Sequence, residues 1–511
     1  MISNWLKRCR GLVDYLENGP TPISYFVLSF LSILILRTFW EHTLLVMEPV
    51  LKVTDDIPHY LLFYTSLALT LTLITSKVAQ VEIGKAARIV MTGFVVLWIV
   101  PFYDRLSHGR DLYSVAYIFP EQGQILMRFL TFFGPLEDMG VTPGMRLEVF
   151  IVMVVWGFYI YLKTNKLGRA FLGAILAYIT IFVYIITPVW LIPIMNFTGL
   201  TYQFSPRLIV DLFLLLSMIQ FLLVSYIASP GVFKTLIKDI RCTRLLHYQL
   251  FLVLGFVMGL KTSLSPIFTE QWIVFRAIEL MLALGFAWIF SVIMNNIVDQ
   301  KIDRVSNPSR PLISGNISVE LYRRIGWGML IAAILFAIAV DQETLLLIAA
   351  FLASYFLYSM PPFRMKRIPI ISKVSIGFNS LLAFMLGHMF IGHNINISLG
   401  IIIFFLIFSS LTANLIDLKD YSGDLQAGIR TLPVLCGMAQ AQKVVGASFF
   451  ISYLIAAYAF KVPELKWLFL AVGVLQAVLI NRKPYNEKPV MVLHITVIAF
   501  LIIYISLRPN L

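Results

Sequence analysis

Residues 295–304 read NNIVDQKIDR, and residues 307–312 continue as NPSRPL, at the end of a long apolar run. Asn295, Asp299 and Asp303 recur in this stretch every four residues. On a helical backbone that rises about 1.5 Å per residue, the three side chains form one ridge about 12 Å long. The stretch therefore predicts a helix that carries a polar, doubly acidic face at its end.

A second acidic stretch, DLKDYSGD, covers residues 417–424. Its acids are Asp417, Asp420 and Asp424, and the spacings of three and then four residues place all three on one helical face. Two such faces at a membrane border could chelate divalent cations around a diphosphate. Ordinary solvated loop charges are the alternative interpretation, and the recurrence of the pattern makes it the weaker one.

The composition indicates a membrane protein. Of 511 residues, 59% are hydrophobic and only 13% are charged, whereas about 25% are charged in soluble proteins. Apolar runs of about 18 residues or more recur along the chain, so we predict a polytopic helical membrane protein. The net charge of +13 is attributed to cytoplasmic loops and not to a nucleic-acid partner. The three cysteines show no paired spacing, which argues against a disulfide framework or a zinc site.

The apolar spans fall into two groups. Six are expected at 22–48, 58–76, 87–103, 147–163, 168–192 and 207–229. Nine more are expected at 247–262, 272–297, 322–340, 344–359, 374–393, 397–415, 442–460, 465–481 and 490–507. A basic connector lies between the groups. The fold class is therefore predicted as an all-α polytopic membrane protein of about 15 transmembrane helices, with domains at 1–240 and 241–511.

The distribution of Lys and Arg supports this span parity. With the N-terminus inside, the loops that are rich in basic residues all lie inside, as the positive-inside rule requires. We therefore expect an integral, multi-pass membrane protein whose N-terminus and two acidic motifs are cytoplasmic.

From about residue 245 to the end, the chain resembles the UbiA-type intramembrane prenyltransferases. Residues 295–303 match the family's first motif, N-D-x-x-D-x-x-x-D, except that Asn296 stands where the family usually has Asp. Residues 358–367, YSMPPFRMKR, resemble its Y-S-x-P-P-x-R-x-K segment, and residues 417–424 match its second acidic motif. A nine-helix bundle with motifs after the second and sixth helices is the family's architecture. The six N-terminal spans carry no motif that we can connect to chemistry.

The resemblance implies roles for individual residues. The catalytic acids would be Asp299, Asp303, Asp417, Asp420 and Asp424. Mg²⁺, the implied cofactor, would be held by Asn295, Asp299, Asp303, Asp420 and Asp424. Substrate would be bound by Asn295, Asn296, Lys301, Arg304, Tyr358, Arg364, Lys366 and Lys419. An amide at position 296 contributes no charge, so it is expected to weaken one metal contact or to shift substrate preference.

The implied function is transfer of a polyprenyl group from a prenyl diphosphate to a lipophilic or aromatic acceptor within the lipid. A UbiA-like phosphoribosyl transferase, a terpene cyclase and a non-catalytic transporter or scaffold remain as alternatives. Intact acidic motifs argue against the last of these. The sequence specifies neither the acceptor, the prenyl chain length, the protein partners nor the oligomeric state.

Overall fold

A computed structural model describes residues 2–41, 43, 50–108, 117, 122–134, 141–196, 206–262, 273–392, 396–426 and 428–508. Within these residues the secondary structure is entirely helical. The chain divides into two compact units, Met1–Pro230 and Gly231–Leu511. The predicted all-α, polytopic fold class is thereby confirmed, whereas the division into functional domains at residue 240 stays a prediction.

The number of possible membrane spans agrees with the sequence. Among the described residues, 14 helices are long and apolar enough to cross a membrane. The number is 15 if Leu399–Thr412 and Leu415–Gln426, which meet at an angle of 44°, form one broken span. With that pair counted once, the candidate spans fall into the predicted groups of six and nine.

The first unit is built from long helices joined by shorter pieces. Its helices are α1 (Ile2–Asn18), α2 (Ile23–Glu41), α3 (Val50–Val78), α4 (Ile83–Gly93), η2 (Phe94–Trp98), α5 (Ile99–His108), η3 (Gln122–Gln124), α6 (Ile125–Leu130), α7 (Pro143–Thr164), α8 (Leu167–Ile185), α9 (Thr187–Asn196) and α10 (Pro206–Ala228). Arg37 and Glu41, one turn apart on α2, form a buried ion pair. The guanidinium of Arg37 also lies 5.0 Å from the centre of the Tyr60 ring. Such pairing reduces the cost of charges inside an apolar span.

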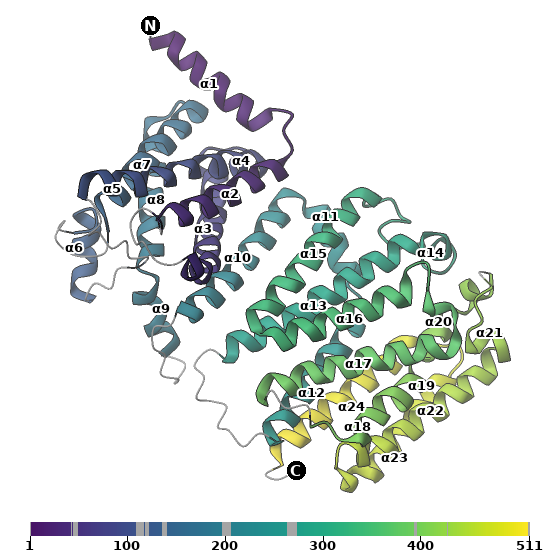
Figure 1. The fold of residues 1–511 in the computed structure, drawn as a ribbon. Helices are drawn as coiled ribbons and strands as arrows, with labels where there is room; N and C mark the ends of the chain where they lie inside the picture. The colour runs from purple at the N-terminus through teal and green to yellow at the C-terminus, as the bar shows by residue number, and fades with distance from the viewer. Residues whose placement is uncertain are drawn as a thin grey trace. The chain divides into compact units, whose positions relative to one another are not determined.

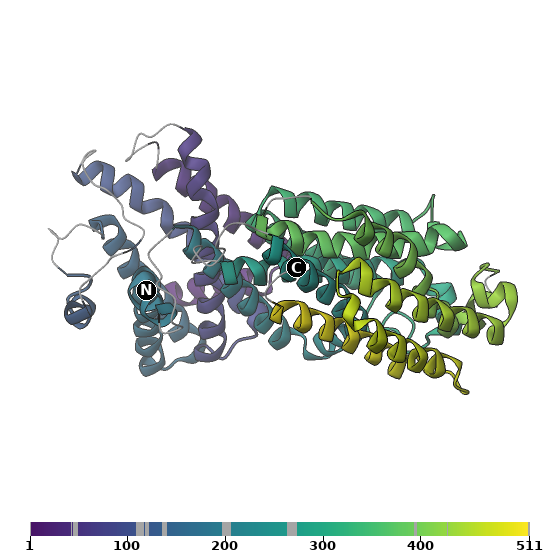
Figure 2. The ribbon, with the colours of Figure 1, turned by 90° about the horizontal axis from the view of Figure 1, so that it is seen from below.

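The second unit is a bundle in which the long helices run side by side, as both views show (Figures 1 and 2). Its first helices are α11 (Pro230–Asp239), α12 (Cys242–Thr262), α13 (Ile273–Val298), α14 (Gln300–Ser306), α15 (Val319–Val340), α16 (Gln342–Ser359), η5 (Met365–Arg367) and α17 (Pro369–Gly392). The later ones are α18 (Leu399–Ile403), η6 (Phe404–Ser409), α19 (Ser410–Thr412), α20 (Leu415–Gln426), α21 (Leu432–Cys436), α22 (Met438–Ala459), η7 (Pro463–Leu465), α23 (Lys466–Asn481) and α24 (Glu487–Leu507). The short helices α14 and α20, which carry acids, contact each other at one end of the bundle.

Two glycines allow α12 and α17 to pack with their backbones in contact. A Cβ atom placed on Gly255 would lie 1.9 Å from the carbonyl oxygen of Phe384, and one on Gly387 would lie 1.9 Å from that of Leu252. No side chain fits into such a gap, so only glycine permits this approach. Small residues at helix contacts are the usual means by which membrane helices approach closely. The contact holds together two of the helices that line the site described below.

Gly387→Ala is expected to destabilise the second unit, because its methyl group would overlap the Leu252 carbonyl and force α12 and α17 apart. Overpacking of this kind costs about 1–3 kcal/mol of unfolding free energy. Thermal unfolding of the purified protein in lipid measures the loss. Gly328→Ala is the matched control, since a Cβ on that α15 glycine meets no atom within 4 Å. Equal stability of the two variants would contradict the close packing.

Candidate active site

The first acidic motif lies where one long helix breaks into a short one. Helix α13 ends at Val298, Asp299 follows as the residue that caps α14, and α14 contains Asp303. The Asp299 amide donates to the Asn295 carbonyl at 2.9 Å, and the Asp303 amide donates to the Asp299 carbonyl at 2.9 Å. These bonds keep the four-residue helical spacing across the break. The predicted ridge of Asn295, Asp299 and Asp303 is therefore confirmed.

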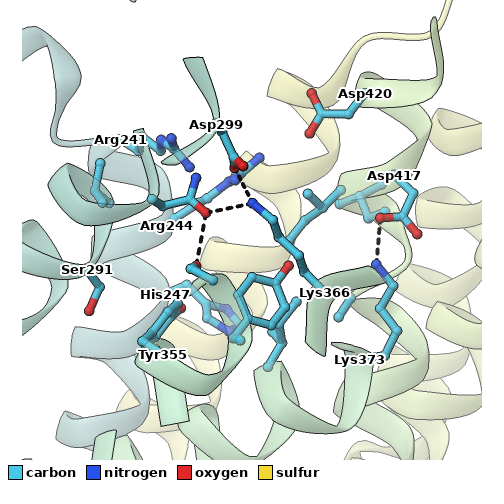
Figure 3. Close-up of a pocket in the computed structure, with 18 of the residues that line it drawn as sticks. Arg241, Arg244, His247, Ser291, Asp299, Tyr355, Lys366, Lys373, Asp417 and Asp420 are labelled. Carbon is cyan, nitrogen blue, oxygen red and sulfur yellow. Dashed lines mark hydrogen bonds and ion pairs between the residues drawn. The ribbon is translucent and has the colours of Figure 1, made fainter. Parts of the chain in front are cut away.

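The second motif forms helix α20, and the predicted helical placement of Asp417, Asp420 and Asp424 is also confirmed. All three carboxylates and those of Asp299 and Asp303 line one cavity of about 210 Å³ (Figure 3). Two sequence segments that are separated by more than 100 residues thus contribute acids to the same site. The cavity lies at the end of the bundle where α14 meets α20.

Cations from the segment after α16 hold the first acid of the site. The Arg364 guanidinium lies 2.8 Å from Asp299 Oδ1, and Lys366 Nζ binds Asp299 Oδ2. Lys366 Nζ also donates to Asn295 Oδ1 at 3.3 Å, and Ser359 Oγ donates to the same oxygen at 3.0 Å. A left-handed backbone at Arg364, with φ of 46°, turns the chain here. The YSMPPFRMKR segment therefore lies beside the first motif.

Asp303 is buried beside a different cation. Arg310 Nη1 lies 2.7 Å from Asp303 Oδ2, and Asn307 Nδ2 lies 3.4 Å from Asp303 Oδ1. Burial, with the charge of Asp299 acting in the same direction, raises the pKa of Asp303 to about 6 against the opposing effect of Arg310. The carboxylate thus stays mostly ionised at neutral pH, where it can act as a metal ligand.

The second motif keeps carboxylate oxygens that no cation covers. Lys373 Nζ lies 2.5 Å from Asp417 Oδ1, whereas Asp417 Oδ2 is buried and has no hydrogen-bond partner in the described part of the chain. Asp420 forms no hydrogen bond or ion pair with any residue that the structure describes, and its carboxylate stands apart in Figure 3. A buried carboxylate oxygen without a partner is costly, which points to a ligand at this position.

The donors fit Mg²⁺, which prefers carboxylate and phosphate oxygens. Within the described ranges, no three acid, histidine or cysteine side chains are arranged so that they could already hold a metal ion. Lining carboxylates and lining cations are equal in number, at five each. The cations are Arg241, Arg244, Arg310, Lys366 and Lys373. The basic side chains of the site therefore lie beside carboxylates to which a divalent cation could also bind.

The other predicted site residues lie in different places. Tyr358 and Asn295 line the cavity. Lys301 and Arg304 are exposed on α14, outside the lining. Lys419 is about half exposed and lies 3.2 Å from Glu487. Direct contact of these three cations with a diphosphate stays a prediction.

Four of the lining cations were not among the predicted site residues: Arg241, Arg244, Arg310 and Lys373. Arg310 lies within the NPSRPL stretch that extends the first motif, so its position was a usable signal. Arg241 and Arg244 lie in the basic connector, which we read as a domain boundary. Nothing in their spacing indicates that α12 begins beside the first motif.

Asn296 does not line the cavity; it is buried behind the first motif, with 2% of its surface exposed. Its amide nitrogen donates to Asp239 Oδ2 and to Tyr322 Oη, both at 2.9 Å. Its amide oxygen accepts from Arg241 at 2.7 Å and from Arg310. An aspartate could accept from the arginines but could not donate to Asp239. The amide at position 296 is thus explained by the connector residues that it binds.

Asn296→Asp is expected to destabilise the protein, because two carboxylates would then meet in a buried position. The lost donor and the repulsion together cost about 1–3 kcal/mol or more of unfolding free energy. Thermal unfolding in lipid measures the effect, with Asn316→Asp at an exposed asparagine as the matched control. The double variant with Asp239→Asn should recover part of the loss. A single variant as stable as the control would refute this account of Asn296.

The chain shows sequence similarity to known proteins over its C-terminal half. Residues 250–489 match the model of the UbiA prenyltransferase family. The digeranylgeranylglyceryl phosphate synthase of Methanoculleus marisnigri is 32% identical over 152 residues, which are 29% of this chain and 52% of that protein. The 2-acylphloroglucinol 4-prenyltransferase of Humulus lupulus is 32% identical over 177 residues, which are 32% of this chain and 42% of that protein. The chain thus spans about half the length of these curated relatives.

Among solved structures, a UbiA homologue from Archaeoglobus fulgidus bound to GPP and Mg²⁺ aligns with a TM-score of 0.44 and 21% identity. The alignment covers 53% of this chain and 98% of that chain. The matched region of the family model lies entirely within the second compact unit.

Proposed function

Residues 250–489 belong to the UbiA prenyltransferase family, and from this premise we propose that the protein transfers a prenyl group. The donor is a prenyl diphosphate, and the acceptor is a lipophilic or aromatic molecule that enters from the membrane. The observation that carries the proposal is the cavity in which five acids from two motifs face five cations. A non-catalytic scaffold has no need for so many buried charges, since each is expensive in a membrane protein.

The cations of the cavity are suited to a diphosphate. Lys366 and Arg364 share Asp299, and Lys373 binds Asp417, so three basic groups from one segment of the chain face the two motifs. With the carboxylates bound to a divalent cation, these basic groups would be available to bind the oxygens of a multiply charged donor. Arg310 and Arg244 contribute further positive charge to the lining of the cavity.

Mg²⁺ held by Asp299, Asp303, Asp417, Asp420 and Asp424 would supply charge neutralisation of the departing diphosphate. The fit rests on the uncovered oxygens of Asp417 and Asp420. Asn295 contributes a further amide oxygen, which Lys366 and Ser359 already orient. The acids and the amide are thereby positioned before any ligand arrives.

Aromatic side chains also line the cavity, and the allylic carbon of the donor would lie against them. Tyr248, Tyr355 and Tyr358 come from α12 and α16, and Trp288 comes from α13. The hydroxyls of Tyr248 and Tyr355 bind each other at 2.6 Å. Ring faces can steady an allylic cation, and an apolar wall keeps water from capturing it.

The two functional domains are proposed to be residues 1–240 and 241–511, and the N-terminus and both acidic motifs are proposed to face the cytoplasm. The diphosphate of the donor would then bind at the end of the bundle where α14 meets α20. The acceptor and the prenyl chain would lie within the lipid. The basic loops on that side are the support for this orientation.

Asp303→Asn and Asp424→Asn test the site, because each removes one carboxylate from a different motif with little change of shape. Each is expected to lower Mg²⁺-dependent prenyl transfer by more than about tenfold while membrane insertion changes little. Thermal unfolding should change little for Asp424→Asn, whereas Asp303→Asn should also lower stability because it leaves Arg310 without its partner. Asn307→Asp, on a residue that also lines the cavity, is a charge-adding comparison, and Glu320→Gln on the exposed start of α15 is the neutral control. Wild-type turnover in both acid variants would contradict the assignment.

A further inference from the structure

A second, smaller cavity lies among the candidate membrane spans of the first compact unit. Its volume is about 50 Å³, and helices α2, α3, α7 and α8 form its wall. A water molecule needs about 10–15 Å³ by this measure, so the cavity has room for about four water-sized groups. Arg37 and Glu148, which both line it, lie inside candidate spans. Charged residues inside a membrane are costly and commonly mark a binding site or a pathway.

The arginine of this cavity already has its partners. Its two terminal nitrogens bind the two carboxylate oxygens of Glu41, with Nη2 3.2 Å from Oε1. The guanidinium carbon of Arg37 lies 5.0 Å from the centre of the Tyr60 ring and 5.7 Å from that of Tyr64. Its Nε has no hydrogen-bond partner among the described residues, but it is fully buried, so a ligand in the cavity cannot reach it. An anion that entered would therefore have to displace Glu41.

The glutamate, by contrast, has no partner. Glu148 forms no hydrogen bond or ion pair with any residue that the structure describes. Among these residues, the other charges that act on it are those of Arg37, Glu41 and Asp104. Asp104 accepts hydrogen bonds at the start of α7, from the Thr142 hydroxyl and from the Gly144 amide. Three acids thus act on one base, and the surroundings of the cavity carry an excess of negative charge.

A polar cluster in the same unit shows how buried polar groups are satisfied elsewhere. The hydroxyls of Ser66 and Thr70 both bind the Tyr184 hydroxyl, at 2.8 and 2.7 Å. Ser66 donates to Gln220 Oε1 at 3.0 Å, and Gln220 Nε2 donates to Thr70 at 2.8 Å. The four side chains thus satisfy one another. The carboxylate of Glu148 lacks such partners, and this state is costly away from water, which points to a ligand that carries hydrogen-bond donors.

The rest of the lining indicates the kind of cation that fits. Two carboxylate oxygens of Glu148 and the hydroxyls of Tyr60 and Tyr64 are fewer than the six or more oxygens that Ca²⁺ takes. Phe63 and Leu67 are among the apolar side chains that form much of the remaining wall. Such a wall suits a short hydrocarbon chain, and aromatic ring faces attract a positive charge. An alkylammonium ion combines both properties.

We propose that the first unit binds a small organic cation in this cavity, namely a primary ammonium ion with a short apolar chain. The ammonium group donates to the Glu148 carboxylate and to the Tyr64 hydroxyl, which has no other partner among the described residues. The chain packs against Phe63 and Leu67. The site lies wholly within Met1–Pro230, so it goes beyond the proposed prenyl transfer and does not depend on it.

Isothermal titration calorimetry of the full-length protein in lipid nanodiscs tests the proposal, with the heat of empty nanodiscs subtracted. At neutral pH, n-propylammonium, which matches the cavity in size, should bind saturably to the wild type. The neutral 1-propanol and the anionic propionate should bind at least about tenfold more weakly, because neither forms a charge-assisted hydrogen bond with a carboxylate. Equal binding of either compound, or no saturable binding of n-propylammonium, would overturn the proposal.

Glu148→Gln identifies the group that binds the cation. The variant should lose at least about tenfold in affinity for n-propylammonium, while its thermal unfolding without ligand should not shift to lower temperature, since the carboxylate has no protein partner to lose. Glu82→Gln is the matched control, because that acid of the same unit has 82% of its side chain exposed. An affinity of Glu148→Gln within about twofold of the control would overturn the role of Glu148. Marked destabilisation by Glu148→Gln would show that the carboxylate is structural and would also overturn that role.

Discussion

The architecture of the second unit depends on one constraint: carboxylates that are buried at the end of a membrane bundle need partners of opposite charge. Asp299 is held by Lys366 and Arg364, Asp303 by Arg310, and Asp417 by Lys373. Removing one partner from such a buried pair leaves an uncompensated charge, at a cost of about 3–5 kcal/mol. The pairs thus connect the break between α13 and α14 to the η5 segment, and α17 to α20, around one cavity. They also keep the acids together until a ligand competes for them.

The cavity has a charged part, where these ion pairs lie, and an aromatic part. The charged part lies where the helices begin or end, and the aromatic part lies one or two turns deeper. The proposed donor would occupy the first part, and the proposed acceptor would occupy the second. The close contact of α12 with α17, through Gly255 and Gly387, keeps His247 beside Ser380. The close backbone contact between α12 and α17 therefore determines how side chains such as His247 are placed in the aromatic part of the cavity.

Much of the fold could be predicted from the sequence, because span length and the spacing of the acids are local properties. The ridge of Asn295, Asp299 and Asp303 and the helix at residues 415–426 both follow from periodicity. The partners of these acids could not be predicted in the same way. Lys373 and Asp417 are brought together by the packing of α17 and α20, and this contact cannot be inferred from their separation in the sequence. The role of Asn296 was hidden for the same reason, since Asp239 and Tyr322 reach it from separate helices.

Diphosphate release by the purified full-length protein in lipid tests the central claim most directly. The assay offers geranyl, farnesyl and geranylgeranyl diphosphate in turn, each with Mg²⁺ and again after chelation, with and without a hydroxy-aromatic acceptor. The account predicts release with at least one donor that disappears on chelation, returns with Mg²⁺, and gives a prenylated product when acceptor is present. Release that is indifferent to chelation, or no release with any donor, would contradict it.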